Sequence, residues 1–177
     1  MRQTSFAEMH CSLARTLQVI GDWWSPLIIR DLYLGLDRFD QLVTDLGISR
    51  NLLTDRLTTL MTGGVVARQS YQDNPTRYRY RLTDAGVDLV PALLALTAWG
   101  DRWVAPDAGP PMRFRHNPCG HRSTPTVTCS VCQQPITGHD IAVTPGPGGR
   151  TAPGTALIAT ALTQSQHLGP DSRTGIG

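Results

Sequence analysis

Four side chains in the second half of the chain have the types and spacing of zinc ligands. Cys119 and His121 are separated by one residue, and Cys129 and Cys132 by two. A Cys-x2-Cys turn presents two thiolates to one metal ion, and a tetrahedral set of three cysteines and one histidine suits structural zinc. Zinc would also fold a segment that has few apolar residues of its own. The sequence therefore predicts one structural zinc ion per chain, bound by Cys119, His121, Cys129 and Cys132.

Other interpretations of this cluster stay open. His116 or His139 could replace His121, since one residue between Cys119 and His121 is a tighter spacing than usual. Cys129 and Cys132 could instead form a redox pair. A zinc-dependent enzyme is a further alternative, but a catalytic zinc needs an open coordination position and a nearby general base. Four protein ligands leave no open position and no Glu lies near the cluster, so we expect no enzymatic activity.

Cys11 is the one cysteine outside the cluster. His10 precedes it and Arg15 follows about one helical turn later. Thiols near basic groups or helix N-termini react faster. Cys11 is therefore a candidate sensor of oxidants or electrophiles, and the alternative is a buried cysteine in an interface.

Polar residues at positions 50–62 have the types that read DNA bases. At about 100° per residue, the leucines of this predicted helix gather on one side. The opposite side carries Arg50, Asn51, Thr54, Asp55 and Thr58. Arg can pair with guanine, Asn with adenine, and Thr with a thymine methyl or a phosphate. The alternative is an ordinary solvated face. Arg56 points toward the buried side, where we expect an intramolecular ion pair.

A basic β-hairpin follows this helix directly. Strands are predicted at residues 65–71 and 77–82, with turn residues at 73–75. Period-two alternation puts Arg77, Arg79 and Arg81 on one face, and Tyr78, Tyr80 and Leu82 on the inward face. Three arginines without an intervening carboxylate favour contact with phosphates, so binding should weaken steeply with salt. The alternative is an edge strand protected by its charges.

Helices must position these residues. Ser25 is the expected N-cap of one helix, and Gly47 should make the tight turn before the helix at 50–62. Thr83 is the expected cap of a long helix reaching about residue 104, in which Pro91 should introduce a bend or remove a hydrogen bond. The predicted helices cover residues 12–20, 25–34, 38–46, 50–62 and 83–104.

Several motifs, in order and with the expected spacing, carry a family resemblance. They occupy residues 11–17, 20–24, 27–32, 35–42, 47–57, 80–86 and 99–100. With them, residues 11–103 resemble the HxlR-type winged-helix transcriptional regulators, relatives of the MarR group. The implied fold is α+β and mainly α: a winged helix-turn-helix domain with a β-hairpin wing and a long C-terminal dimerisation helix.

The resemblance also implies a function. Such proteins are cytoplasmic homodimers that place two recognition helices in successive major grooves of a near-palindromic operator. We therefore expect a DNA-binding regulator that represses transcription and responds to an oxidant, an electrophile or a small molecule. A protein-interaction module built on the winged helix is the alternative. The expected dimer interface comprises Leu13, Leu17, Val90, Leu93, Leu94, Thr97 and Trp103.

Composition sets the remaining limits. The 177 residues carry a net charge of only +2, so any affinity for nucleic acid must come from a local basic face. No apolar run approaches membrane-spanning length, so no membrane partner is expected. We expect a winged-helix and dimerisation domain at 1–104, a zinc-ribbon-like extension at 105–143 and a disordered Pro/Gly-rich tail at 144–177. Within this tail, a weak apolar stretch at 156–162 could form a short helix. Trp23, Trp24, Trp99 and Trp103 are expected in structural packing, with an effector cavity as the alternative.

Overall fold

The computed structural model describes residues 6, 8–152 and 154–165, and the chain forms two compact units. One unit is Asp22–Ile136, and the other combines Met1–Gly21 with Thr137–Gly177. The structure thus assigns the N-terminal helix to a different unit from the winged helix. The predicted boundaries after residues 104 and 143 remain a prediction.

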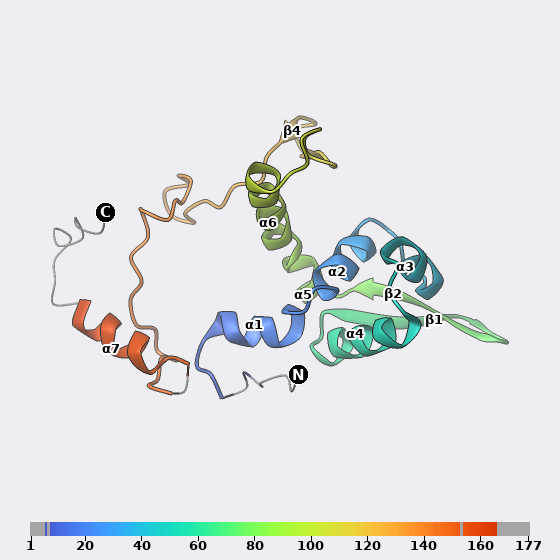
Figure 1. The fold of residues 1–177 in the computed structure, drawn as a ribbon, viewed down its shortest axis with the longest axis horizontal. Coiled ribbons are helices and arrows are strands. Elements are labelled where there is room, and N and C mark those ends of the chain that lie inside the picture. The colour runs from blue at the N-terminus through green and yellow to red at the C-terminus, as the bar shows by residue number, and fades with distance from the viewer. Residues whose placement is uncertain (1–5, 7, 153, 166–177) are drawn as a thin grey trace. The chain divides into compact units, whose positions relative to one another are not determined.

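The unit Asp22–Ile136 is mainly helical with one long β-hairpin, which confirms the predicted fold class. Helices α2, α3 and α4 pack beside the antiparallel hairpin β1–β2, and α2 also packs against α6 (Figure 1). In the described part of the chain, no helix combines the length and the apolar character that a membrane span requires. The elements of this unit are α2 (Ser25–Tyr33), α3 (Phe39–Leu46), α4 (Arg50–Thr62), β1 (Val66–Asp73), β2 (Thr76–Leu82), α5 (Asp84–Asp88), α6 (Val90–Trp103), β3 (Phe114–Arg115) and β4 (Arg122–Ser123).

The core lies where α2, α3 and α4 meet the hairpin. Its fully buried apolar side chains come at helical spacing from each of these helices, and strand residues close it from the other side. Burying a Leu or Ile side chain stabilises the fold by roughly 1.5–3 kcal/mol, so this cluster fixes the position of α4. The buried apolar residues include Ile28, Ile29, Leu42, Leu53, Leu57, Leu60, Val65, Val66 and Tyr80.

Local signals predicted the limits of α4 correctly. Ser49 is its N-cap, and the Ser49 hydroxyl accepts a hydrogen bond from the backbone N–H of Leu52 at 3.3 Å. Gly47 ends α3 with φ of 63°, a left-handed conformation that glycine adopts without steric cost. A tight turn between α3 and α4 follows, as expected for a helix-turn-helix.

The predicted cap of α2 was wrong. Ser25 is the first residue of the helix, and Asp22 accepts hydrogen bonds from the backbone N–H groups of Trp24 at 2.8 Å and Ser25 at 3.0 Å. The Ser25 hydroxyl also donates to Asp22. A carboxylate therefore replaces the hydroxyl as acceptor for the free N–H groups at this helix start.

The predicted long helix is two helices. Thr83 caps α5 as expected, since its hydroxyl accepts from the backbone N–H of Gly86 at 3.2 Å. The chain then turns at Leu89, and α6 begins at Val90. Pro91 lies in the first turn of α6, where its missing N–H removes no helical hydrogen bond. Proline thus coincides with a new helix start rather than with a bend.

The two strands form an antiparallel hairpin, as predicted, and its register has one irregularity. Ala67 pairs with Arg81 and Gln69 with Arg79, while Tyr71 is an extra residue at a bulge between Ser70 and Gln72. An isolated antiparallel β-bridge between Arg38 and Arg79 places the segment before α3 beside β2. The bulge and the bridge both change the surroundings of Arg79.

The second unit contains α1 (Ser12–Ile20) and α7 (Ala156–Ser165). The limits of α1 agree with the prediction. Helix α7 lies in the tail that was expected to be disordered, and it extends the weak apolar stretch predicted at 156–162. The apolar stretch at 156–162 thus lies in the short helix that its residues allowed, so the disorder expected for the tail does not hold for these residues.

Candidate nucleic-acid interface

The polar face of α4 is exposed, as the helical periodicity predicted. Leu53, Leu57 and Leu60 are buried beneath it. The exposed set is Arg50, Asn51, Thr54, Asp55 and Thr58. The Thr54 and Thr58 hydroxyls donate to the backbone carbonyls one turn earlier, at 2.9 and 2.8 Å, so in this state they offer oxygen acceptors and methyl groups outward. The face therefore presents the groups that read base edges.

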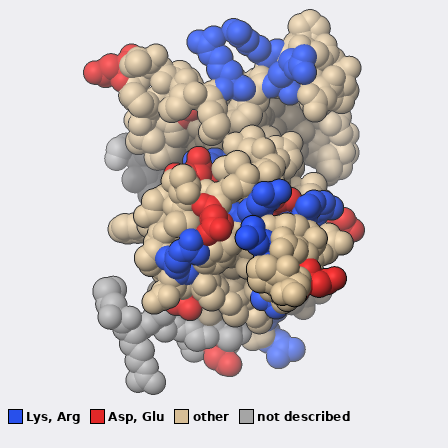
Figure 2. Space-filling model, turned by 90° about the vertical axis from the view of Figure 1, so that its right-hand side faces the viewer, with Lys and Arg blue, Asp and Glu red and all other residues tan. Residues whose placement is uncertain are grey.

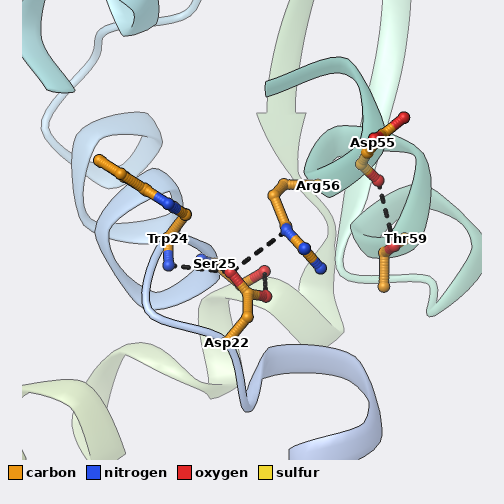
Figure 3. A network of polar contacts seen from close by, with 6 residues as sticks. All are labelled: Asp22, Trp24, Ser25, Asp55, Arg56 and Thr59. Atoms are coloured by element: carbon orange, nitrogen blue, oxygen red, sulfur yellow. Dashed lines mark hydrogen bonds and ion pairs between the residues drawn. The ribbon is translucent and has the colours of Figure 1, made fainter. Parts of the chain in front are cut away.

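Asp22 links the start of α2 to the middle of α4. Figure 3 shows the Asp22 carboxylate between the backbone N–H groups of Trp24 and Ser25 and the side chain of Arg56. The Arg56 Nε atom lies 3.5 Å from Asp22 Oδ1, and the two side chains are only 25% and 16% exposed. The predicted intramolecular ion pair of Arg56 is confirmed.

Arg50 is paired within the protein. Its guanidinium lies 2.6 Å from the Asp40 carboxylate of α3 and 5.5 Å from the centre of the Phe39 ring. Both charged side chains are well exposed. An exposed pair of this kind contributes little to stability, so a phosphate or a base can compete with Asp40 for the guanidinium. Sequence analysis missed Asp40, although it lies in the first turn of the helix that precedes Gly47.

The wing arginines are not equivalent. Arg77 and Arg81 are exposed, as predicted. Arg79 is half-buried, with its Nε 3.9 Å from Asp37 and its guanidinium 5.0 Å from the centre of the Tyr71 ring. No carboxylate lies between these arginines in the sequence, but Asp37 reaches Arg79 from the segment before α3.

The inward face of the wing also differs from the prediction. Tyr80 is buried, while Tyr78 is 37% exposed and lies under the guanidinium of Arg68, 4.2 Å from its ring centre. Arg68 and Arg38 are exposed arginines that sequence reasoning missed. The guanidinium of Arg38 lies 5.5 Å from the centre of the Tyr71 ring, a contact between segments far apart in the sequence that only the fold reveals.

A shallow hollow lies between these elements. It has a volume of about 590 Å³ and is bounded by the first turns of α3 and α4 and by the outer part of the hairpin. Basic and acidic side chains are mixed on the face that Figure 2 presents, which agrees with the ion pairs of Arg50 and Arg79. The residues that line the hollow include Arg38, Asp40, Arg50, Tyr71, Arg77 and Tyr78.

The four predicted zinc ligands do not come together in the structure. Cys119 has His116 beside it rather than His121, with 3.3 Å between His116 Nδ1 and Cys119 Sγ. Hydrogen bonds from the backbone N–H groups of Cys132 and Val131, and from the Cys132 thiol, lower the pKa of the Cys129 thiol. Among the described residues, no three His, Cys, Asp or Glu side chains are close enough to share one metal ion. Zinc binding stays a prediction.

Cys11 is the N-cap of α1 and carries a free, half-buried thiol. It lines an open hollow of about 1020 Å³ within its unit, together with His10, Arg15 and residues of the 143–151 segment. Leu13 and Leu17 of the same helix are exposed and available to a partner. The position agrees with a helix N-terminal thiol, and its reactivity stays a prediction.

The predicted dimer residues of α6 fall into two groups. Val90 is buried, and Leu93, Leu94 and Thr97 line a small apolar pocket of about 90 Å³ against α2. These four residues contact their own unit, whereas the predicted dimer residue Trp103 is exposed. The dimer interface stays a prediction. The free face of α6 carries Leu96, Trp99 and Trp103, which are 64%, 59% and 63% exposed. Trp23 is also exposed. Structural packing within the unit was therefore the wrong expectation for Trp23, Trp99 and Trp103.

Comparisons with known proteins agree with this geometry. The family model described as HxlR-like helix-turn-helix matches residues 19–108. An uncharacterised HTH-type transcriptional regulator of Mycobacterium bovis, Mb3122, is 40% identical over 137 residues, covering 77% of this chain and 87% of that protein. The crystal structure of PA1607, a candidate transcription factor, has a TM-score of 0.70 at 33% identity and covers 80% of this chain and 99% of that one.

A redox protein is also among the similar structures. The redox regulator HypR in its oxidised form has a TM-score of 0.50 at 30% identity. The match covers 54% of this chain and 100% of the HypR chain. The family assignment rests on three findings. The family model matches half of the chain, Mb3122 is 40% identical to it, and an exposed α4 lies beside a basic wing. The chain belongs to the HxlR-like helix-turn-helix family and is a transcriptional regulator.

Proposed function

We propose that this regulator binds duplex DNA as a homodimer and represses transcription by occupying a near-palindromic operator. The observation that carries the proposal is the exposed polar face of α4, held on a buried leucine core beside the arginines of the wing. Arg50 and Asn51 at the start of α4 read base edges in the major groove, and Arg77 and Arg81 contact the phosphates. The proposed function is DNA binding alone, so we propose no enzymatic activity.

The homodimer rests on a second observation. Leu96, Trp99 and Trp103 form an exposed apolar stripe at i, i+3 and i+7 on α6. Contiguous exposed apolar surface of this kind marks an interaction site. A twofold axis along such a stripe makes each copy contact the same residues of the other, and it places two α4 helices about one helical turn of DNA apart.

The test uses fluorescence anisotropy with labelled duplex from upstream of the protein's own gene, at two salt concentrations. We expect tight binding that weakens steeply with salt, because each phosphate contact releases counterions. Arg50→Ala and Asn51→Ala should lower the affinity for this duplex more than for random duplex. Arg150→Ala, an exposed arginine of the other unit, is the matched control and should bind like wild type. Equal affinity of wild type for the upstream and random duplexes would contradict sequence-specific binding there.

A protein-interaction module remains the alternative, and the same experiment separates the two. If no duplex binds above background at either salt concentration, the winged helix does not read DNA in this form. Salt-sensitive duplex binding would exclude protein interaction as its only function.

We also propose that oxidation of Cys11 releases the DNA. The free thiol lies at the N-cap of α1 on the wall of an open hollow, where a small oxidant reaches it. The similar structure of HypR, a redox regulator, supports a redox signal for this chain as well. We expect diamide, which takes two electrons and two protons from a pair of thiols, to join Cys11 of the two protomers in a disulfide and to weaken operator binding of wild type. Cys11→Ser should be unchanged. The triple variant C119S/C129S/C132S keeps Cys11 and should respond like wild type.

A small-molecule effector is the alternative signal. If wild type binds the operator tightly and diamide does not change this affinity, Cys11 is excluded as the sensor. A small-molecule effector is then the favoured signal.

A further inference from the structure

Two short hairpins follow α6 in the unit Asp22–Ile136, and they have the same backbone geometry. In the first, β3 pairs with β4. The backbone N–H of His116 donates to the carbonyl of His121 at 2.9 Å, and the N–H of Gly120 donates to the carbonyl of His116 at 2.8 Å. The loop between the strands is therefore a closed turn that begins at His116.

The second hairpin repeats both hydrogen bonds. Thr128 pairs with Pro135 across it. The N–H of Cys129 donates to the carbonyl of Gln134 at 2.9 Å, and the N–H of Gln133 donates to the carbonyl of Cys129 at 2.9 Å. Cys129 thus occupies the place that His116 has in the first hairpin, and Cys132 the place of Cys119.

The residue after the second ligand position is left-handed in both hairpins. Gly120 has φ of 72°, and Gln133 has φ of 61°. Gln133 is the only residue other than glycine with positive φ in the described part of the chain. A side chain rarely adopts this conformation unless the site requires it. Both turns therefore have the same backbone conformation. Their first residues, His116 and Cys129, and their fourth residues, Cys119 and Cys132, occupy equivalent positions.

Those positions hold metal-binding side chains in both hairpins. His116 and Cys119 already converge, with 3.3 Å between Nδ1 and Sγ. Two tetrahedral zinc ligands with bond lengths of about 2.0 and 2.3 Å lie roughly 3.5 Å apart, so this pair has the spacing of ligands to one ion. His121 corresponds instead to Gln134, and its backbone carbonyl closes the hairpin. The geometry thus separates His116 from His121 as ligand.

We propose that His116, Cys119, Cys129 and Cys132 bind one structural Zn²⁺ ion that joins the two hairpins. No three of these side chains are together among the described residues, so binding closes the two hairpins onto each other. The connecting residues 124–127 contain no helix or strand that would resist this movement. Three cysteines and one histidine fill a tetrahedral zinc, which leaves no position for catalysis.

Zinc binding would also explain how a segment with almost no buried apolar side chains can fold. Most residues between Ala105 and Ile136 are exposed, and the large apolar Val127 and Val131 are among them. A segment of this kind gains its folding free energy from metal ligation, as zinc ribbons do. Binding releases protons from the three thiols, so affinity for zinc should fall as the pH is lowered.

The test measures zinc in the full-length chain purified under reducing conditions, by native mass spectrometry and by release of zinc to a chromogenic chelator. We expect one zinc ion per chain in wild type. His116→Ala, Cys129→Ser and Cys132→Ser should lose it, while His121→Ala and Cys11→Ser should keep it. Cobalt substitution should give tetrahedral ligand-field bands and thiolate charge-transfer bands in wild type, and Cys119→Ser, like the other three ligand variants, should lose both.

Three outcomes would overturn the proposal. One is wild type without zinc after growth and purification with added zinc. Another is loss of zinc in His121→Ala together with retention in His116→Ala, which would assign the other histidine. The third is a Cys129–Cys132 disulfide in metal-free protein that zinc does not prevent, which would make the pair a redox site. Operator binding or far-ultraviolet circular dichroism of each variant shows that the winged helix remains folded.

Discussion

The Asp22 carboxylate lies 3.5 Å from Arg56 Nε while its Oδ1 atom also accepts two backbone N–H groups at the start of α2. One side chain thus caps α2 and links it to α4 (Figure 3). The cap satisfies N–H groups that the helix itself cannot pair. The ion pair fixes the angle between α2 and the polar face of α4.

Asp22→Ala should therefore lower both stability and DNA affinity. Loss of a helix cap costs about 0.5–2 kcal/mol, and the half-buried Arg56 left without its partner adds to this. We expect a loss of roughly 1–3 kcal/mol in the free energy of unfolding, measured by urea denaturation. Asp55→Ala, an exposed carboxylate of α4, should change stability by less than about 0.5 kcal/mol. An equal effect of both variants would contradict the linking role of Asp22.

Asp40→Asn should strengthen operator binding. The substitution removes the carboxylate that lies 2.6 Å from Arg50, so the guanidinium no longer has to leave a partner to reach DNA. Exposed pairs are worth about 0–1 kcal/mol, so the gain should be up to roughly fivefold. Asp45→Asn removes the same charge from the same helix but lies beside Arg30, 3.5 Å away, and controls for the change in net charge. Equal gains in both variants would show that only net charge matters.

Arg77 and Arg79 should respond differently to alanine. Arg77 is exposed, so Arg77→Ala should weaken binding to all duplexes and reduce the salt slope by about one. Arg79 packs between Asp37 and Tyr71, so Arg79→Ala should chiefly lower the thermal midpoint. The measurements are anisotropy titrations at several salt concentrations and thermal unfolding. A reduced salt slope in Arg79→Ala at unchanged stability would reverse the assignment.

Asp31 should make stability depend on pH. Burial raises the pKa of this carboxyl above its ordinary value of 3.8, and Arg30 beside it lowers the pKa only in part. The folded state therefore holds the proton more tightly than the unfolded state, so this group contributes less stability as the pH rises from about 3.8 to its raised pKa. Relative to Asp31→Asn, wild type should lose free energy of unfolding over this window and then level off. Parallel pH curves for wild type and Asp31→Asn would contradict this, with exposed Asp107→Asn as the control.

Trp99→Glu should convert the dimer to a monomer. A carboxylate in the middle of the apolar stripe of α6 would be buried without a partner in the interface. Light scattering after size exclusion should report half the wild-type mass, and operator binding should weaken because two half-sites are no longer bound together. Val87→Glu on α5 also places a charge at an exposed apolar position and should leave the mass unchanged. A wild-type mass for Trp99→Glu would move the interface elsewhere.

Local signals in the sequence determined much of this protein. The limits of α1 and α4, the cap at Ser49, the turn at Gly47 and the exposed face of α4 follow from interactions between residues a few positions apart. Helical periodicity and capping act over one or two turns, so they can be read without the fold. The family resemblance has the same basis, since its motifs lie in these helices.

The tertiary structure decided the partners of the charged side chains. Asp22 replaced Ser25 as the cap, Asp37 reached Arg79, and Asp40 reached Arg50, each by contact between segments that only folding brings together. The free face of α6 was likewise visible only once Val90, Leu93 and Leu94 had packed against their own unit. The proposal of His116 rather than His121 as a zinc ligand depends on a hairpin whose backbone hydrogen bonds span its loop. Residue type predicts which groups can interact, and the path of the chain determines which of them meet.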